Sequence, residues 1–170
     1  MEKIESLQDL LLHELKDMYH AEQQLVDALP EVIEKASSPE LKQAIQQHLV
    51  ETEGHVNRLE LVFDLLGQPA KAVKCKAMAG ILDEGKEMMK SKAPPETLDA
   101  GIVMSAQKVE HYEICAYGSM ATWAEMIGRS DIKALLGQTL NEEQQADKKL
   151  TEIAKASVNR QSAHQPRAAA

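Results

Sequence analysis

Four long stretches of the chain carry apolar residues at steps of three and four positions, and this spacing constrains the fold more than any other feature. Such steps place the residues on one face of an α-helix. The stretches cover roughly residues 6–36, 38–66, 95–128 and 130–158. Their apolar positions include Leu11, Leu15, Leu25, Leu29, then Leu41, Ile45, Leu59, Val62, then Ile102, Met120, Ala124, and finally Ile132, Leu136 and Leu150. The pattern predicts four long amphipathic helices.

Residues typical of helix ends separate these stretches. Five signals mark them: Ser6 as an N-cap, Ser38 before Pro39, Gly67 as a stop, Pro95 as a start, and Ser130 or Asp131 as a cap. Between the second and third stretches, residues 73–90 or so predict a further, shorter helix. The short links after the first and third helices require antiparallel neighbours, whereas the 67–95 connection can cross over between two hairpins.

We therefore expect an all-α fold, an antiparallel four-helix bundle with a short additional fifth helix in the 67–95 connection. Aromatic residues make up 3% of the 170 residues although 44% are hydrophobic. This composition argues against a β-sandwich or barrel, which depends on aromatic and β-branched residues. Residues 1–158 are expected to form a single domain, and residues 159–170 a flexible tail.

The charge balance and the cysteines exclude several classes of protein. The formal net charge is -8, from 27 acidic and 19 basic residues, so we expect no nucleic-acid partner. No apolar run approaches the ~20 residues of a membrane span, and no secretory signal is recognised at the N-terminus. Cys75 and Cys115 form neither a disulfide framework nor a CxxC metal site. We expect a cytoplasmic protein that does not contact a membrane.

Acidic residues interrupt each apolar stripe near its middle. Glu22, Glu51, Glu110 and Glu143 lie close to the midpoints of the four predicted helices. In an antiparallel bundle the midpoints meet in one layer, so each helix delivers a carboxylate to the same part of the core. His48, His55, Glu113 and Asp147 lie about one helical turn away. The spacing therefore predicts a cluster of carboxylates and imidazoles inside the bundle.

Two divalent cations would balance four buried carboxylates, which otherwise repel one another. Carboxylate oxygens with imidazole suit iron or manganese. The candidate metal ligands are Glu22, Glu51, His55, Glu110, Glu113, Glu143 and Asp147, with His48 as the alternative to His55. Three other interpretations stay open: protonation of some carboxyl groups, a hydrated polar layer without metal, and, for any single glutamate, a solvated position in a groove.

The segments around these residues resemble the YciE/YciF family of bacterial stress-associated proteins, within the ferritin-like, rubrerythrin-like superfamily. The segments that carry the resemblance are 19–25, 48–55, 107–117, 140–147 and 78–84. The resemblance implies a five-helix protomer, a di-iron or di-manganese centre, a role in stress response, and a homodimer formed through the short helix around Met78–Met89. The chain departs from the superfamily because it has no Glu-x-x-His, and Ala146 stands where that histidine is expected.

Two functional hypotheses follow. The first is a di-metal oxidoreductase that reacts with oxygen or peroxide, in which Tyr117 donates a hydrogen bond to a ligand or, less favoured, an electron. The second is a metal-free helical dimer that acts as a non-enzymatic stress or scaffold protein.

Overall fold

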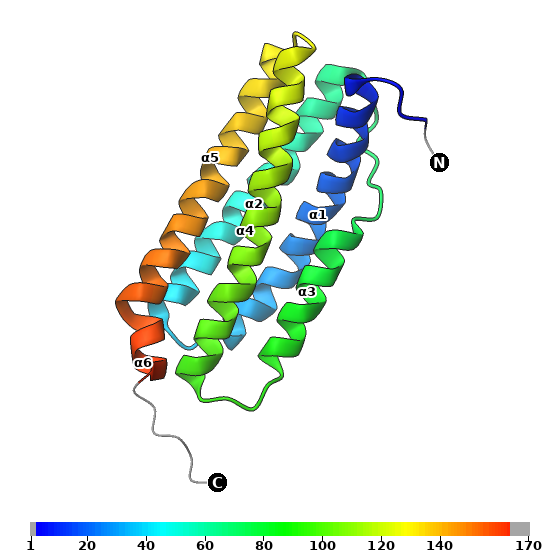
Figure 1. Cartoon of the computed structure of the whole chain (residues 1–170). Helices are drawn as coiled ribbons and strands as arrows, with labels where there is room; N and C mark the ends of the chain where they lie inside the picture. Colours follow the sequence, from blue (N-terminus) through cyan, green and yellow to red (C-terminus); the bar gives the residue numbers. More distant parts are fainter. Residues whose placement is uncertain (1–2, 164–170) are drawn as a thin grey trace.

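The structure is a computed structural model that describes residues 3–163. Four long helices form an antiparallel bundle (Figure 1): α1 (Leu7–Lys35), α2 (Pro39–Leu66), α4 (Pro95–Met126) and α5 (Ser130–Ile153). A shorter helix, α3 (Lys76–Met89), lies in the connection between α2 and α4. The predicted all-α bundle with a fifth helix in the 67–95 connection is confirmed.

Local side chains account for the ends of α1 and α2. The hydroxyl of Ser6 accepts a hydrogen bond from the backbone N–H of Asp9 at 3.1 Å, and Ser38 caps α2 in the same way. Gly67 ends α2 in the left-handed conformation, with φ of 63°, which glycine adopts at little cost.

The start of α5 differs from the prediction. Ser130 is the first helical residue and Arg129 is the N-cap, so neither Ser130 nor Asp131 caps the helix. The Asp131 carboxylate instead accepts two hydrogen bonds from the Arg129 guanidinium, at 2.7 and 3.0 Å. This ion pair replaces the side-chain cap that the sequence pattern predicted.

The bundle consists of two hairpins joined by a crossover. The hairpin of α1 and α2 packs against that of α4 and α5, so that α1 contacts α4 and α2 contacts α5. Figure 1 shows that the connection after α2 returns along the bundle through α3, so that α4 runs parallel to α2. α3 packs against α4 and α1. Each long helix consequently has antiparallel neighbours.

Two apolar clusters fill the core and a polar layer separates them. The first cluster includes Leu11, Leu15, Phe63, Met120, Ile132 and Leu136. The second includes Leu29, Leu41, Ile45, Ile102, Leu150 and Ile153. Between them lie buried glutamates and histidines from all four long helices. Apolar residues therefore cover the polar layer on both sides along the length of the bundle.

The apolar residues of α3 pack against other helices of the same chain. Met78 and Met89 are buried, and Ile81 and Leu82 pack against the first core cluster, so these residues form the face by which α3 packs on the bundle. The exposed positions of α3 are mostly charged, as in Asp83, Glu84 and Lys86. A homodimer through α3 stays a prediction.

The C-terminal part of the helical domain is longer than predicted. After α5 the chain forms a π-helical turn, η1 (Ala154–Val158), and then α6 (Asn159–Ala163), where the sequence analysis expected the tail to begin. Residues 164–170 of the expected tail lie outside the described residues. None of the helices within residues 3–163 is long and apolar enough to cross a membrane.

Candidate metal centre

Six buried side chains from the four long helices meet in the polar layer. α1 contributes Glu22, α2 contributes His48 and His55, α4 contributes Glu110 and Glu113, and α5 contributes Glu143. Spacings of three and seven residues place each pair from one helix on the same inward face. Of these six, four glutamates and His55 belong to the ligand set predicted from sequence, and His48 was its alternative.

These side chains form two groups that share one carboxylate. His48, Glu110, Glu113 and Glu143 each offer a ligand atom within 4.8 Å of the others. Glu22, His55 and Glu143 form the second group under the same limit. Because Glu143 belongs to both, the two groups are adjacent, and each has a set of side chains that could hold a cation. Oxygen and imidazole donors of this kind suit iron or manganese.

Most polar atoms of the layer lack a hydrogen-bond partner. Within the described residues, the buried unpartnered side-chain atoms are Glu22 Oε2, both ring nitrogens of His48, His55 Nδ1, Glu110 Oε2, and both oxygens of Glu113 and of Glu143. All nine belong to the two groups. Native cores satisfy nearly all buried polar atoms, so this concentration of unsatisfied donors and acceptors indicates a missing partner.

Burial and mutual repulsion disturb the ionisation of the glutamates on α4. Burial raises the pKa of Glu113 well above its ordinary range, and the neighbouring carboxylates of Glu22, Glu143 and Glu110 raise it further. The pKa of Glu110 is raised for the same two reasons, with Glu143 as the main neighbour. Without a cation, the layer therefore favours protonated carboxyl groups on α4.

His55 compensates part of this negative charge. Burial alone would lower the pKa of His55, but contacts with the carboxylates of Glu143 and Glu22 outweigh burial and raise it to about 10. Its Nδ1 lies 2.9 Å from Glu143 Oε1 and 3.5 Å from Glu22 Oε1. Burial opposes ionisation of Glu143 too, yet His55 lowers the pKa of that carboxyl group to about 2.

The outer edge of the His55 ring is held by residues that the sequence analysis missed. His55 Nε2 lies 2.9 Å from Glu142 Oε2, and Arg58 binds both oxygens of Glu142 at 2.7 and 3.1 Å. Arg58 also donates to Thr139 at 2.5 Å. Two spacings were available as signals: Arg58 follows His55 by three positions, and Glu142 directly precedes Glu143.

Tyr117 and Glu22 close the other side of the layer. The Tyr117 hydroxyl donates a hydrogen bond to Glu22 Oε1, and its ring centroid lies 6.4 Å from that of His55. Tyr117 is fully buried, and burial followed by the Glu22 charge raises the pKa of its phenol well above the ordinary value. Tyr117 therefore acts as the hydrogen-bond donor that the sequence analysis favoured.

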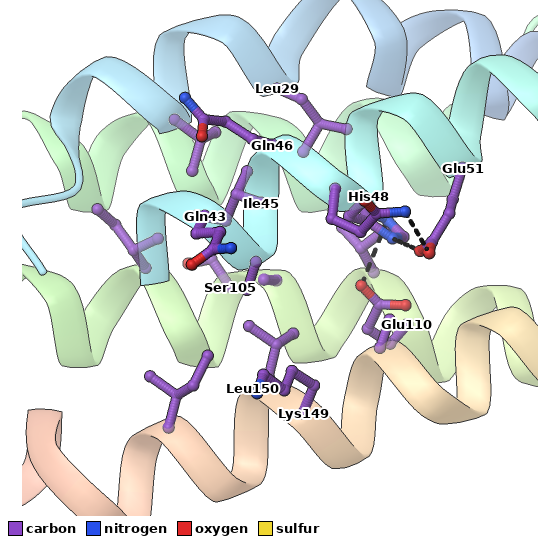
Figure 2. A pocket seen from close by; sticks show the side chains of 18 of the residues that line it. Leu29, Gln43, Ile45, Gln46, His48, Glu51, Ser105, Glu110, Lys149 and Leu150 are labelled. Atoms are coloured by element: carbon purple, nitrogen blue, oxygen red, sulfur yellow. Dashed lines mark hydrogen bonds and ion pairs between the residues drawn. The ribbon is translucent and has the colours of Figure 1, made fainter. Parts of the chain in front are cut away.

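Glu51 and Asp147 lie outside both groups. The Glu51 side chain is 32% exposed, and its closest approach to His48 is 3.9 Å (Figure 2). Asp147 accepts one hydrogen bond from Gln107 and approaches His111. At 100° per residue these positions are rotated by roughly 40–60° from the inward-facing residues of their helices. The position of a residue at the midpoint of its helix thus predicts its height along the bundle, but not whether its side chain points inward.

The family model for a domain of unknown function, DUF892, matches residues 6–163. The protein YciF of Escherichia coli K12 is 40% identical over 158 residues, covering 92% of this chain and 95% of YciF. The chain is thus similar to a curated protein along nearly its whole length.

Solved structures agree with this relationship. The crystal structure of the E. coli stress protein YciF matches with a TM-score of 0.88 at 40% identity, over 92% of this chain and 99% of that one. YcfI from Rhodopseudomonas palustris gives 0.86 at 45% identity, over 88% and 96% of the two chains. A protein from Xanthomonas campestris, 19% identical over 91% of this chain and 94% of that one, gives 0.72 and shares the fold. The chain therefore belongs to the DUF892 family, and the predicted resemblance to the ferritin-like stress protein YciF and its relatives is confirmed.

Proposed function

We propose that the protein holds two divalent metal ions, iron or manganese, in the polar layer of its bundle. The observation that carries this proposal is the set of nine buried, unpartnered ligand atoms gathered in two groups around Glu143. His55 Nδ1 and Glu143 Oε1 approach one another at 2.9 Å as an ion pair, but a core that only required a polar layer would pair nearly all of the nine atoms in this way. Their free electron pairs are instead available to cations.

The charge of the layer supports two ions rather than one. Glu22, Glu110, Glu113 and Glu143 carry four negative charges when ionised, and two divalent cations neutralise them. Binding would remove the need to protonate Glu110 and Glu113, whose pKa values are raised in the absence of a cation. Ligands that must lose protons bind metal more tightly as the pH rises.

Each residue has a distinct part in this proposal. His48 with Glu110 and Glu113 would hold one ion, Glu22 with His55 would hold the other, and Glu143, which belongs to both groups, would serve either. Arg58 and Glu142 keep the His55 ring in place, and Tyr117 orients Glu22. Two ions of variable oxidation state would supply electrons for the reduction of oxygen or peroxide. We add a role in stress response to the proposal because the relative YciF is described as a stress protein.

Metal analysis of protein produced with added iron and manganese tests the proposal. We expect about two ions per wild-type chain, and a loss of at least one ion in Glu113→Gln, which removes a ligand while keeping the shape of the side chain. Glu51→Gln is the matched control because Glu51 lies beside the layer but outside both groups. Substoichiometric metal that is the same in all three proteins would leave the alternative, a metal-free scaffold.

A further inference from the structure

A pocket opens from the surface toward the polar layer, between α2 and α5. It has a volume of about 1060 Å³, and residues of α1, α3 and α4 complete its wall. We call it the side pocket. Figure 2 shows it from close by, with His48 and Glu110 at one end and Ile45 and Leu150 further along. Its volume is in the range of known small-molecule sites.

The deep wall of the side pocket is apolar. Leu29, Ile45, Ile102, Leu150 and Ile153 line it, and all five are buried members of the second core cluster. Polar and charged side chains, among them Gln43, Lys148 and Lys149, stand at exposed positions of the wall. A ligand that covers the deep wall would therefore be mainly apolar, and would gain about 0.8 kcal/mol for each CH₂ group removed from water.

One end of the side pocket is polar and unsatisfied. Among its lining residues, His48 and Glu110 are the only buried polar ones, at 8% and 2% exposure. His48 Nε2 approaches Glu110 Oε1 at 3.4 Å (Figure 2), but both ring nitrogens of His48 and Oε2 of Glu110 lack a hydrogen-bond partner. The wall thus offers a donor and an acceptor beside the apolar part of the pocket.

The charges at this end favour a neutral ligand group. Glu113 and Glu143 lie in the same group as Glu110, so a carboxylate entering the metal-free protein here meets the negative charge of Glu143 and two carboxyl groups whose own ionisation burial and repulsion already oppose. This step rests on the proposed function, in which two divalent ions balance the negative charges of the four glutamates. A charged group on the ligand would then find no opposite charge left to pair with. A hydroxyl group needs none, since it can donate to Glu110 and accept from His48.

We propose that the side pocket binds an unbranched aliphatic molecule that ends in a hydroxyl group, with the chain on the apolar wall and the hydroxyl facing His48 and Glu110. Small side chains leave room for such a chain. Ala44 on α2, Ala106 on α4 and Ala146 on α5 all line the pocket. A leucine at any of these positions would occupy the space that the ligand requires.

Calorimetric titration with 1-hexanol, 1-heptanol and 1-octanol tests the proposal. Each added CH₂ should tighten the Kd about four-fold, the ratio equivalent to about 0.8 kcal/mol. Octanoate and octylamine should bind more weakly than 1-octanol to the metal-loaded protein. A Kd that does not change with chain length, or tighter binding of either charged analogue, overturns the proposal.

Pocket-filling variants separate binding in the side pocket from adsorption elsewhere. Ala146→Leu should weaken 1-octanol binding at least ten-fold, whereas Ala134→Leu, at an exposed position of the same helix, should bind as the wild type does. Ala44→Leu repeats the test from α2 if Ala146→Leu fails to fold. Equal binding by the wild type and both pocket variants overturns the proposal.

Two further readouts distinguish this proposal from its alternatives. If the alcohols bind in the side pocket while metal analysis finds no ions, the proposed function fails and the pocket assignment stands. If the ions are present and no alcohol binds, only the pocket assignment fails. A wild-type dimer that Ala146→Leu converts to a monomer in sedimentation would identify the pocket as a surface between two copies of the chain, and would overturn the proposal.

Discussion

His55 Nε2 lies 2.9 Å from Oε2 of Glu142, on the edge of the imidazole that faces away from the two metal-binding groups. Burial opposes ionisation of Glu142, but its hydrogen bonds with Arg58 lower the pKa of this carboxyl group, so it is ionised and only accepts. The proton of the neutral ring is thereby fixed on Nε2. In that form Nδ1 carries no proton and faces Glu22 and Glu143, as the proposed role of His55 as a metal ligand requires.

Glu142→Ala should lower metal affinity about 10–100-fold, the usual cost of removing a residue that orients a histidine ligand. Competition with a chelator of known affinity measures this change. Glu53→Ala removes an exposed acid from α2 and is the charge-matched control. Equal affinities for the two variants would show that the contact between Glu142 and His55 does not orient the ligand.

Tyr117→Phe should destabilise the metal-free protein by about 1–3 kcal/mol, because Oε1 of the buried Glu22 loses its hydrogen bond while the ring remains. Thermal unfolding measures the loss, at about 2–4 °C per kcal/mol for a chain of this size.

Tyr19→Phe is the matched control for this substitution, since Tyr19 donates to Glu60 on the exposed face of α2. Water can replace that bond, so its loss should cost less. A larger loss at Tyr19 than at Tyr117 would contradict the assigned role of Tyr117.

The fold could be predicted from sequence because every long helix repeats one apolar spacing over many turns, and because Ser6, Ser38 and Gly67 mark helix ends by their own chemistry. The start of α5 was misplaced since the ion pair of Arg129 and Asp131 satisfies these side chains without a cap. Such a pairing depends on side-chain conformation, which the spacing of residues does not contain.

The site was predicted in part for a similar reason. Glu22, Glu110 and Glu143 lie at the helix midpoints and also on the inward faces of their helices, so they reach the polar layer. Glu51 and Asp147 lie at the height of the polar layer along the bundle, but not on the inward face of their helices. The partners Arg58 and Glu142 follow no apolar pattern. Their spacing from His55 and Glu143 does not show that they pair with each other, because only the contact between α2 and α5 brings them together.

The stability of the metal-free protein should fall as the pH rises. The folded-state pKa values of Glu110 and Glu113 are raised above the ordinary 4.5, so ionising them costs folding free energy from that pH upward. The folded-state pKa of His55 is raised from 6.5 to about 10, so its stabilisation is complete below 6.5 and is lost as the pH approaches 10. Both effects have the same sign.

Bound metal should reverse this trend, because the ligands bind it in their deprotonated forms. The difference in Tm between metal-loaded and metal-free protein should therefore widen between about pH 5 and about pH 8. Thermal scans of both forms across this range measure it. A difference that is constant or narrows with pH would contradict the assignment of Glu110 and Glu113 as ligands.

Asp99 joins the start of α4 to the turn between α1 and α2. It is 2% exposed and accepts hydrogen bonds from the Ser37 backbone and hydroxyl and from the Ser38 backbone, at 2.6–2.8 Å. Asp99→Asn places an N–H₂ group where one oxygen accepted, and should cost about 1–3 kcal/mol.

Urea unfolding of Asp99→Asn measures this cost, with Ser38→Ala as a comparison that removes the N-cap of α2 and should cost about 1 kcal/mol. Metal content should not change in either variant, since Asp99 lies outside both metal-binding groups. A stable Asp99→Asn variant would show that the amide satisfies the same donors. Loss of metal without loss of stability would instead connect this turn to the polar layer.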